Sequence, residues 1–289
     1  METTELLKKV RAIELRTRGL SKQIFSGEYH SAFKGRGMAF SENREYQHGD
    51  EIRTIDWNVT ARMGHPYVKV FEEERELTAM ILVDVSSSGN FGTRTQLKKT
   101  LITELTAVLA FSAIQNNDKI GVILFSDRIE KFIPPKKGRS HILRIIRELL
   151  DFEPEGTKTD IAFALDYMNR VIKKRSICFV LSDFIDDNFE QSLKIASRKH
   201  DLVALKIEDP GEEELPKAGW LLFRDSENGE MTWVNSNLKR NRLRLKHAFL
   251  ERNKRIKEQF TRAGVDNITI RTNRPYVRSL MNLFKQRTR

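Results

Sequence analysis

The stretch that decides the fold is Ile81-Leu82-Val83-Asp84-Val85-Ser86-Ser87-Ser88, a short apolar run that ends on a carboxylate and hydroxyls. An unbroken apolar run of this length is typical of a strand that is buried on both faces, as in a parallel sheet. Ligands of open α/β sheets lie beyond the carboxyl ends of the strands. The sequence therefore predicts that Asp84, Ser86 and Ser88 present oxygen atoms at a ligand-binding edge.

From Thr78 onward, apolar runs of strand length alternate with segments of helical periodicity. This alternation predicts an α/β fold with a doubly wound, mainly parallel sheet and helices on both faces. Residues 129–133 are expected to pair antiparallel with 120–125 at the sheet edge, and Pro134-Pro135 are expected to end that strand. The other predicted strands are 79–83, 177–181, 202–207 and 267–270, and the predicted helices lie around 97–109, 142–149, 161–172, 189–196, 238–262 and 277–284.

Two domains are expected, an N-terminal module of residues 1–76 and an α/β domain of residues 77–289. The module should contain an amphipathic helix over 4–18 and a strand over 67–71. The α/β domain should carry an insertion at about 208–237, an acidic loop followed by a hairpin, because Asn228-Gly229 lies between two apolar runs.

The composition is that of an ordinary globular protein. Hydrophobic residues make up 39% of the 289-residue chain, and no apolar run approaches the roughly 18 residues of a membrane helix. The charged N-terminus does not resemble a signal peptide, and the single cysteine, Cys178, lies in an apolar run where core packing is its expected role. These features predict a cytoplasmic protein.

The net charge of +11 is concentrated near the C-terminus, since residues 239–262 carry +8 and residues 263–289 carry +5. A basic helix of this kind could bind nucleic acid or an acidic protein partner. Its aromatic residues fall on the apolar stripe, so no platform for base stacking is expected. A solvated helix face is the simpler interpretation. The basic residues with which phosphates would make contact are Arg240, Arg244, Lys254, Arg255 and Lys257.

Two further oxygen donors are expected at the edge where Asp84 lies. Thr159 precedes a predicted helix, and Asp183 follows the predicted strand over 177–181. Together with Asp84, Ser86 and Ser88 they form the pattern of a metal-ion-dependent adhesion site, and hard oxygen donors suit Mg²⁺ or Mn²⁺. The alternative is a cluster of capping and turn residues, which we prefer for Ser87 and Thr157.

In this pattern the sequence resembles a von Willebrand factor A-like domain. A block ahead of it, with Arg44, Tyr46, Gly49-Asp50, Arg53, Ile55-Asp56-Trp57, Ala61-Arg62 and Phe71-Glu72-Glu73-Glu74, resembles the bacterial "domain of unknown function 58" family. The Asp225–Glu230 hairpin and the segment from Thr272 onward are also similar to that family. The Arg and Asp residues of the block are interpreted either as a partner surface or as ion pairs that hold a small β unit against the main domain.

The chemistry of the pattern points to binding. With neutral hydroxyls around it, a divalent ion would keep positive charge and attract a carboxylate from a partner protein. The resemblance implies that this partner is a MoxR-type AAA+ ATPase and that the pair acts in assembling or maturing protein complexes. Nucleotide-binding, serine-hydrolase and zinc-protease motifs are absent from the sequence, so an enzyme is not expected, although a Mg²⁺-dependent hydrolase remains a competing hypothesis.

Overall fold

A computed structural model describes residues 8, 10–17, 19–20, 38–73, 77–92, 96–224 and 229–288. Contacts divide the chain into two compact units, one of residues 34–76 and one that combines residues 1–33 with 77–289. The described N-terminal helical residues thus belong with the α/β unit, where Val10 is buried in the core and Arg16 pairs with Glu104 at 2.6 Å. This grouping differs from the expected 1–76 module, because an apolar stripe does not reveal which surface will cover it.

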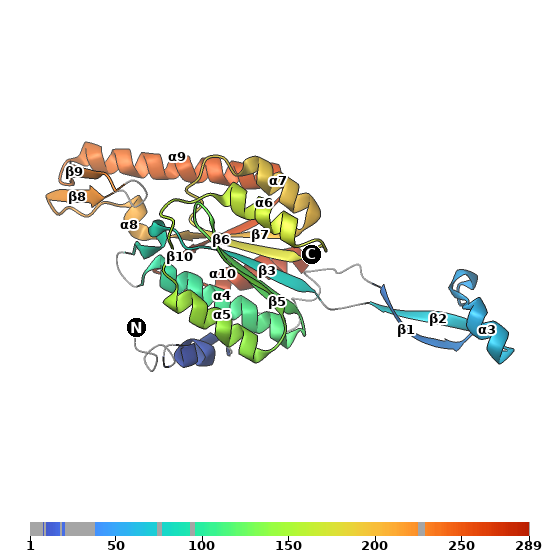
Figure 1. The fold of residues 1–289 in the computed structure, drawn as a ribbon. Helices are drawn as coiled ribbons and strands as arrows, with labels where there is room; N and C mark the ends of the chain where they lie inside the picture. Colours follow the sequence, from blue (N-terminus) through green and yellow to red (C-terminus); the bar gives the residue numbers. More distant parts are fainter. Residues whose placement is uncertain are drawn as a thin grey trace. The chain divides into compact units, whose positions relative to one another are not determined.

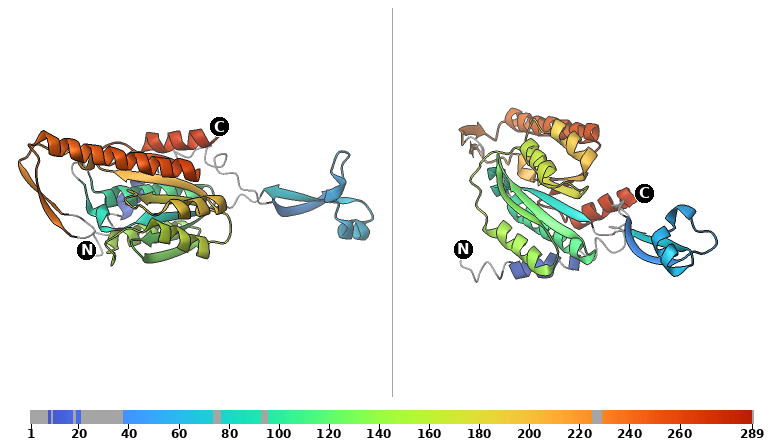
Figure 2. Two further views of the ribbon diagram at one scale, coloured as in Figure 1. Left: turned by 90° about the horizontal axis from the view of Figure 1, so that it is seen from above. Right: turned by 45° about the vertical axis from the view of Figure 1, so that its right-hand side comes forward.

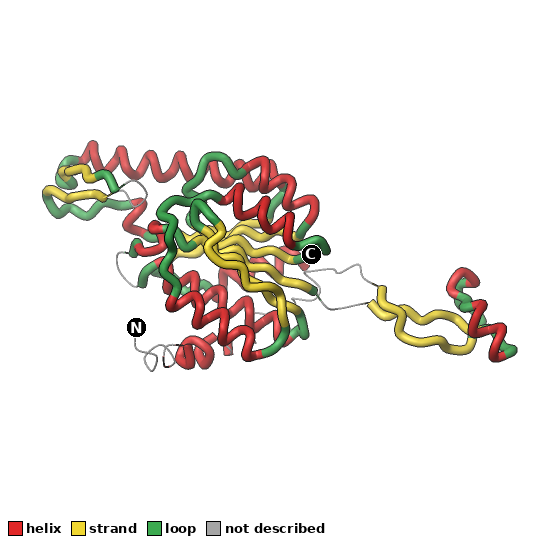
Figure 3. The backbone as a smooth tube through the Cα atoms, in the orientation of Figure 1, coloured by secondary structure: helices red, strands yellow, loops and turns green. Residues whose placement is uncertain are grey.

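The α/β unit contains the predicted mainly parallel sheet (Figures 1 and 3). Its six strands follow the order β10-β7-β6-β3-β4-β5, and every neighbouring pair is parallel except β4 with β5. Strand β3, which contains the apolar run Ile81-Leu82-Val83, lies inside the sheet with a strand on each side, as its continuous apolar character requires. The strands are β3 (Thr78–Asp84), β4 (Lys119–Phe125), β5 (Ile129–Lys136), β6 (Ile177–Ser182), β7 (Asp201–Glu208) and β10 (Asp266–Arg271).

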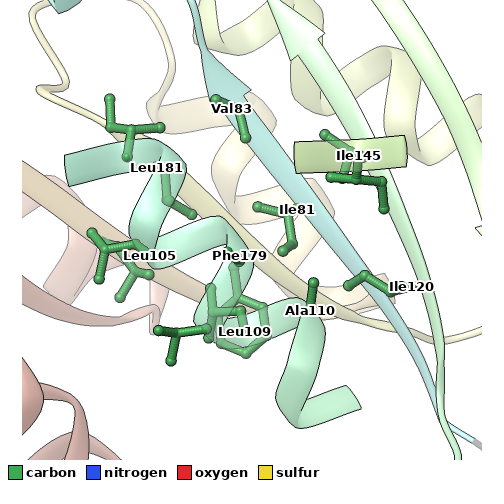
Figure 4. Close-up of a cluster of buried hydrophobic side chains, with 14 of the residues drawn as sticks. Ile81, Val83, Leu105, Leu109, Ala110, Ile120, Ile145, Phe179 and Leu181 are labelled. Atoms are coloured by element: carbon green, nitrogen blue, oxygen red, sulfur yellow. The ribbon is translucent and has the colours of Figure 1, made fainter. Parts of the chain in front are cut away.

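Helices cover both faces of this sheet, as expected (Figure 2). One face carries α4 (Lys98–Gln115), α5 (Arg139–Asp151) and α10 (Val277–Thr288), and the other carries α6 (Ile161–Val171), α7 (Glu190–Lys199) and α9 (Lys239–Ala263). Alternate residues of β3 enter the two cores. Ile81 and Val83 pack against α4 and against Phe179 and Leu181 of β6 (Figure 4), while Met80 and Leu82 face α6 and α7.

Two local elements differ from the sequence prediction. β5 continues through Pro134 and Pro135 to Lys136, because an edge strand has one side on which no backbone donor is required. The acidic segment after β7 contains a short helix, α8 (Pro210–Glu213), rather than only a loop. Asp209 caps this helix, accepting a hydrogen bond from the Gly211 N–H at 2.8 Å while Glu212 accepts one from the Asp209 N–H.

The predicted hairpin is formed by β8 (Trp220–Arg224) and β9 (Met231–Asn235), which pair antiparallel. Residues 225–228, between them, lie outside the described residues.

Residues 34–76 form a small β unit of their own. It contains β1 (Met38–Glu45), the 3₁₀ turn η1 (Ile52–Thr54), α3 (Trp57–Met63) and β2 (Tyr67–Glu73), with β1 and β2 antiparallel. Charged residues of the family-like block interact inside this unit. Arg44 donates two hydrogen bonds to Asp50, at 2.9 and 2.7 Å, and Asp56 caps α3 by accepting from the Asn58 and Val59 N–H groups.

Candidate metal site

The predicted ligands lie at the carboxyl end of two neighbouring strands. Asp84 is the last residue of β3, and Asp183 directly follows β6. β3 and β6 are parallel and in register, with Val83 opposite Leu181, so both carboxylates lie at the same sheet edge. Ser86 and Ser88 belong to the turn after β3, in which η2 (Ser87–Asn90) begins.

Asp84 is held rigidly by its neighbours. It is 5% exposed, its Oδ1 accepts a hydrogen bond from the Ser86 N–H at 3.0 Å, and its Oδ2 accepts one from the Ser182 hydroxyl at 2.6 Å. The Ser86 and Ser88 hydroxyl oxygens are 3.0 Å apart and hydrogen-bonded to one another. Each carboxylate oxygen can accept a second bond, so Asp84 retains capacity for a cation.

Asp183 is buried and hydrogen-bonded to three groups. Its carboxylate accepts bonds from the Ser88 hydroxyl, from the Ile185 N–H at 3.2 Å and from the Lys98 ammonium at 3.0 Å. Ser88 therefore links the loop after β3 to the loop after β6. The structure brings Asp84, Ser86, Ser88 and Asp183 into one continuous hydrogen-bonded network.

Thr159 lies in the neighbouring loop that precedes α6. The loop is attached to the serine turn by a hydrogen bond from the Ser87 N–H to the Thr157 carbonyl oxygen, at 3.3 Å. The hydroxyl oxygen of Thr159 is buried and has no hydrogen-bond partner among the described residues. An unpaired buried hydroxyl is costly, so this oxygen is a candidate ligand.

Gly156 sets the course of this loop. A Cβ at Gly156 would overlap the Ser126 hydroxyl and the Asp127 carboxylate, so only glycine fits between them. The Gly156 N–H donates to Glu130 at 2.8 Å, and Glu130 also accepts a bond from the Ser126 hydroxyl at 2.6 Å. These contacts anchor the segment that carries Thr159 to the end of β4.

Lys98, the first residue of α4, is a functional residue that the sequence reasoning missed. It is 1% exposed, and its ammonium bonds to Asp183 and to Glu212 of α8. Burial alone would lower the pKa of Lys98, but the two adjacent carboxylates outweigh burial and raise that pKa. The one signal in the sequence was a lysine in the first turn of a helix, where the helix dipole disfavours positive charge. The sequence marks the Ser182-Asp183 pair at this strand end as a source of oxygen donors, but only Asp183 was taken as a ligand, and the bond from Ser182 to Asp84 was not foreseen.

Acidic side chains outnumber basic ones in this network. Asp84 and Asp183 are almost fully buried, and the Lys98 ammonium that bonds to Asp183 is shared with Glu212, which also interacts with the charge of Lys206. Burial and the nearby Asp183 carboxylate raise the pKa of Asp84 to about 6. Burial would also raise the pKa of Asp183, but the Lys98 ammonium more than compensates and holds that pKa below its usual range.

The donor set fits a hard divalent cation. It consists of two carboxylates and three hydroxyls, all oxygen, and a Mg²⁺ or Mn²⁺ ion would offset the negative charge that Lys98 only partly neutralises. In the described part of the chain, His, Cys, Asp and Glu side chains nowhere form a group of three that could hold a metal. A cation held at this edge would therefore need hydroxyl as well as carboxylate oxygens. Asp84 and Ser86 also line a cavity of about 260 Å³ beside α4 and α5, and the lining of this cavity does not include Ser88, Thr159 or Asp183.

The fold and this edge define a class, the von Willebrand factor A-like domain. The sheet order, the helices on both faces and the polar edge at Asp84 confirm the predicted fold class. The profile described as "Protein of unknown function DUF58" matches residues 42–256, and the chain belongs to this family.

The chain is also similar to an uncharacterised protein and to solved structures. The chain is 29% identical over 232 residues to the uncharacterized protein Mb1516 of Mycobacterium bovis, covering 79% of this chain and 73% of that protein. Among solved structures it is similar to an aerotolerance-related membrane protein of Bacteroides fragilis, with a TM-score of 0.51 and 17% identity over 73% of this chain and 98% of that one. The VWA domain of SpRpn10 matches with a TM-score of 0.39 and 13% identity, over 72% and 94% of the two chains. None of the described helices has the length and apolar character needed to cross a membrane.

Proposed function

We propose that this chain is a protein-interaction module that binds its partner through a divalent cation at the Asp84 edge. Asp84, Ser86, Ser88, Thr159 and Asp183 would hold the ion. A bound Mg²⁺ or Mn²⁺ supplies a positive charge at the surface, where a partner's carboxylate can approach it. The observation that carries this proposal is the pair of buried carboxylates, Asp84 and Asp183, joined through Ser86 and Ser88 in one network of oxygen donors.

The residues of the network have separate roles in this proposal. The bond from Ser182 orients the Asp84 carboxylate, and the Lys98 ammonium keeps Asp183 ionised. The hydroxyls of Ser86, Ser88 and Thr159 offer neutral oxygen atoms, so they would complete the coordination of an ion without cancelling its charge. An ion held in this way attracts an external anion more strongly than one surrounded by carboxylates.

A binding role is favoured over catalysis. The Ser86 and Ser88 hydroxyls bond to one another, and no histidine is hydrogen-bonded to either among the described residues. A serine nucleophile that relies on a histidine base is therefore not supported by the described contacts. Hydrolysis of a phosphate ester by the wild-type chain, lost in Asp84→Asn, would instead identify a metal-dependent hydrolase.

The partner that the family resemblance implies is a MoxR-type AAA+ ATPase, and the pair would act in assembly or maturation of protein complexes. A purified MoxR-type ATPase from the same organism is the probe, tested for retention on the immobilised wild-type chain in Mg²⁺ and in EDTA. Retention should require Mg²⁺ and should be lost in Asp84→Ala. Asp187→Ala is the matched control, because that carboxylate is largely exposed and pairs only loosely with Arg255 at 3.9 Å. Equal retention in all conditions would reject metal bridging.

The basic helix α9 is the basis of an alternative, binding to nucleic acid or to an acidic protein. Lys239, Arg240 and Arg244 are exposed on α9, whereas Phe249 and Phe260 are buried. The helix therefore offers phosphate contacts but no aromatic stacking surface. Retention of a single-stranded oligonucleotide that falls steeply with salt would support this alternative.

A further inference from the structure

The two edges of the sheet are built differently. β5 ends the sheet on one side and carries Pro134 and Pro135, together with irregular register against β4. β10 ends it on the other side and has no proline. Its register with β7 is unbroken from Asp266 opposite Val203 to Arg271 opposite Glu208. Prolines and bulges protect an edge from added strands, so among the described strands β10 is the edge left open to one.

A groove follows this open edge. A cavity of about 580 Å³ is lined by the five consecutive residues 267–271 of β10. Consecutive strand residues point to opposite faces, so a cavity that touches all of them runs along the edge and not over one face. The residues that flank it are Asn253, Ile256, Lys257 and Phe260 of α9 on one side, and Arg274, Pro275, Tyr276 and Ser279 at and before α10 on the other.

Positive charge dominates the groove. Lys206, Lys257, Arg271 and Arg274 line it, against the one carboxylate of Glu208. Glu208 is already engaged by Lys206 at 2.7 Å and by Arg271 at 3.4 Å. Lys257 and Arg274 are exposed, and neither has a carboxylate partner among the described residues. One unpaired cation thus lies on each wall, and the buried side chains of Ile256, Phe260 and Tyr276 also border the groove.

We propose that the groove binds an extended acidic segment of a partner protein, which adds to β10 as a further strand. Main-chain hydrogen bonds to the open edge would supply affinity, and side chains of the added strand would alternate between the α9 wall and the α10 wall. Carboxylates on the segment would meet Lys257 and Arg274. A second copy of this chain is a poorer occupant, because pairing two β10 edges would bring the same cations together. The residues that line the groove include none of the proposed metal ligands.

The experiment measures binding of a fluorescein-labelled peptide of alternating Glu and Val by fluorescence anisotropy. Three peptides separate the contributions: the Glu-Val peptide, a Lys-Val peptide of opposite charge, and a Glu-Pro peptide that keeps the charge but lacks half of its N–H donors. The variants are Lys257→Glu/Arg274→Glu in the groove and Lys254→Glu/Arg278→Glu outside it. All four positions are exposed, and the charge change is the same in both pairs. Thermal unfolding of each variant confirms that it is folded.

The proposal expects the Glu-Val peptide to bind, with about tenfold loss in Lys257→Glu/Arg274→Glu and about twofold loss in Lys254→Glu/Arg278→Glu. The Glu-Pro peptide should bind about tenfold more weakly than the Glu-Val peptide, and the Lys-Val peptide should not bind. EDTA should leave binding unchanged, which separates this groove from the metal site. Amide hydrogen exchange should slow in residues 266–271 when the Glu-Val peptide is present. Absence of binding, equal loss in the two double variants, or equal binding of the Glu-Pro peptide would overturn the proposal.

Discussion

The buried ammonium of Lys98 gives the sharpest prediction about the candidate site. Lys98→Met keeps an unbranched side chain of similar length but removes the charge that Asp183 and Glu212 share. Removing one partner of a buried ion pair costs about 3–5 kcal/mol, because the remaining charges stay desolvated. Lys98→Met should therefore destabilise the folded chain by about 3–5 kcal/mol in the absence of metal.

The assay is urea unfolding near neutral pH in EDTA, followed by circular dichroism. Lys99→Met is the matched control, since the Lys99 ammonium makes one hydrogen bond to the Phe152 carbonyl oxygen at 2.9 Å and its loss should cost about 1 kcal/mol. Adding Glu212→Gln to Lys98→Met should recover part of the loss, because it removes one of the two stranded carboxylates.

Divalent cations extend the same test. If Asp183 holds a cation, Mg²⁺ should stabilise Lys98→Met more than the wild type, because the metal replaces the missing positive charge. A cost for Lys98→Met no larger than that for Lys99→Met would refute the reasoning that Asp183 and Glu212 depend on the buried ammonium.

Two further predictions concern the loop before α6 and a buried histidine. Gly156→Ala should cost about 1–3 kcal/mol and weaken Mn²⁺ binding, because the added Cβ overlaps Ser126 and Asp127 and displaces the segment that carries Thr159. Urea unfolding and Mn²⁺ titration measure these effects against Gly19→Ala, where a Cβ meets open space, and equal behaviour of the two variants would argue against this role for Gly156. Burial, followed by the nearby charges of Lys199 and Arg175, lowers the pKa of His200 to about 4. Between about pH 4 and about pH 6.5 the unfolded chain therefore binds more protons than the folded chain. The contribution of neutral His200 to the free energy of unfolding is therefore complete above about pH 6.5 and is lost as the pH falls. Between about pH 7 and about pH 5, the free energy of unfolding of the wild type should fall by about 2 kcal/mol more than that of His200→Gln. His247→Gln, at an exposed histidine, should follow the wild type, and a His200→Gln curve parallel to the wild type would contradict the assigned cause.

The sequence was sufficient to predict the sheet because its signals are local. The unbroken apolar run of β3 and the alternation of strand and helix patterns predicted the fold class and the edge where Asp84 lies. Asp183 was placed correctly at the neighbouring strand end for the same reason: parallel strands carry their carboxyl ends to one edge. Whether the five residues bind a metal stays a prediction.

The contacts that the sequence did not predict join distant segments. Lys98 meets Glu212 across 114 positions of chain, and Ser182 meets Asp84 across 98. A lysine at a helix start and a serine at a strand end normally face solvent, so nothing local marks them as buried. The N-terminal helix was recognised from its periodicity, but its packing surface depends on tertiary contacts such as that of Arg16 with Glu104. Pro134 and Pro135 were expected to end β5, because the sequence does not show that the side of β5 away from β4 needs no donor.

Titration with Mn²⁺, followed by electron paramagnetic resonance, tests the central claim most directly. Wild type should bind one Mn²⁺ per chain, Asp84→Asn and Asp183→Asn should bind it at least about tenfold more weakly, and Asp187→Asn should match the wild type. Absence of Mn²⁺ binding by the wild-type chain, or equal affinity in all four proteins, would contradict the proposal that this sheet edge is a cation-dependent docking site.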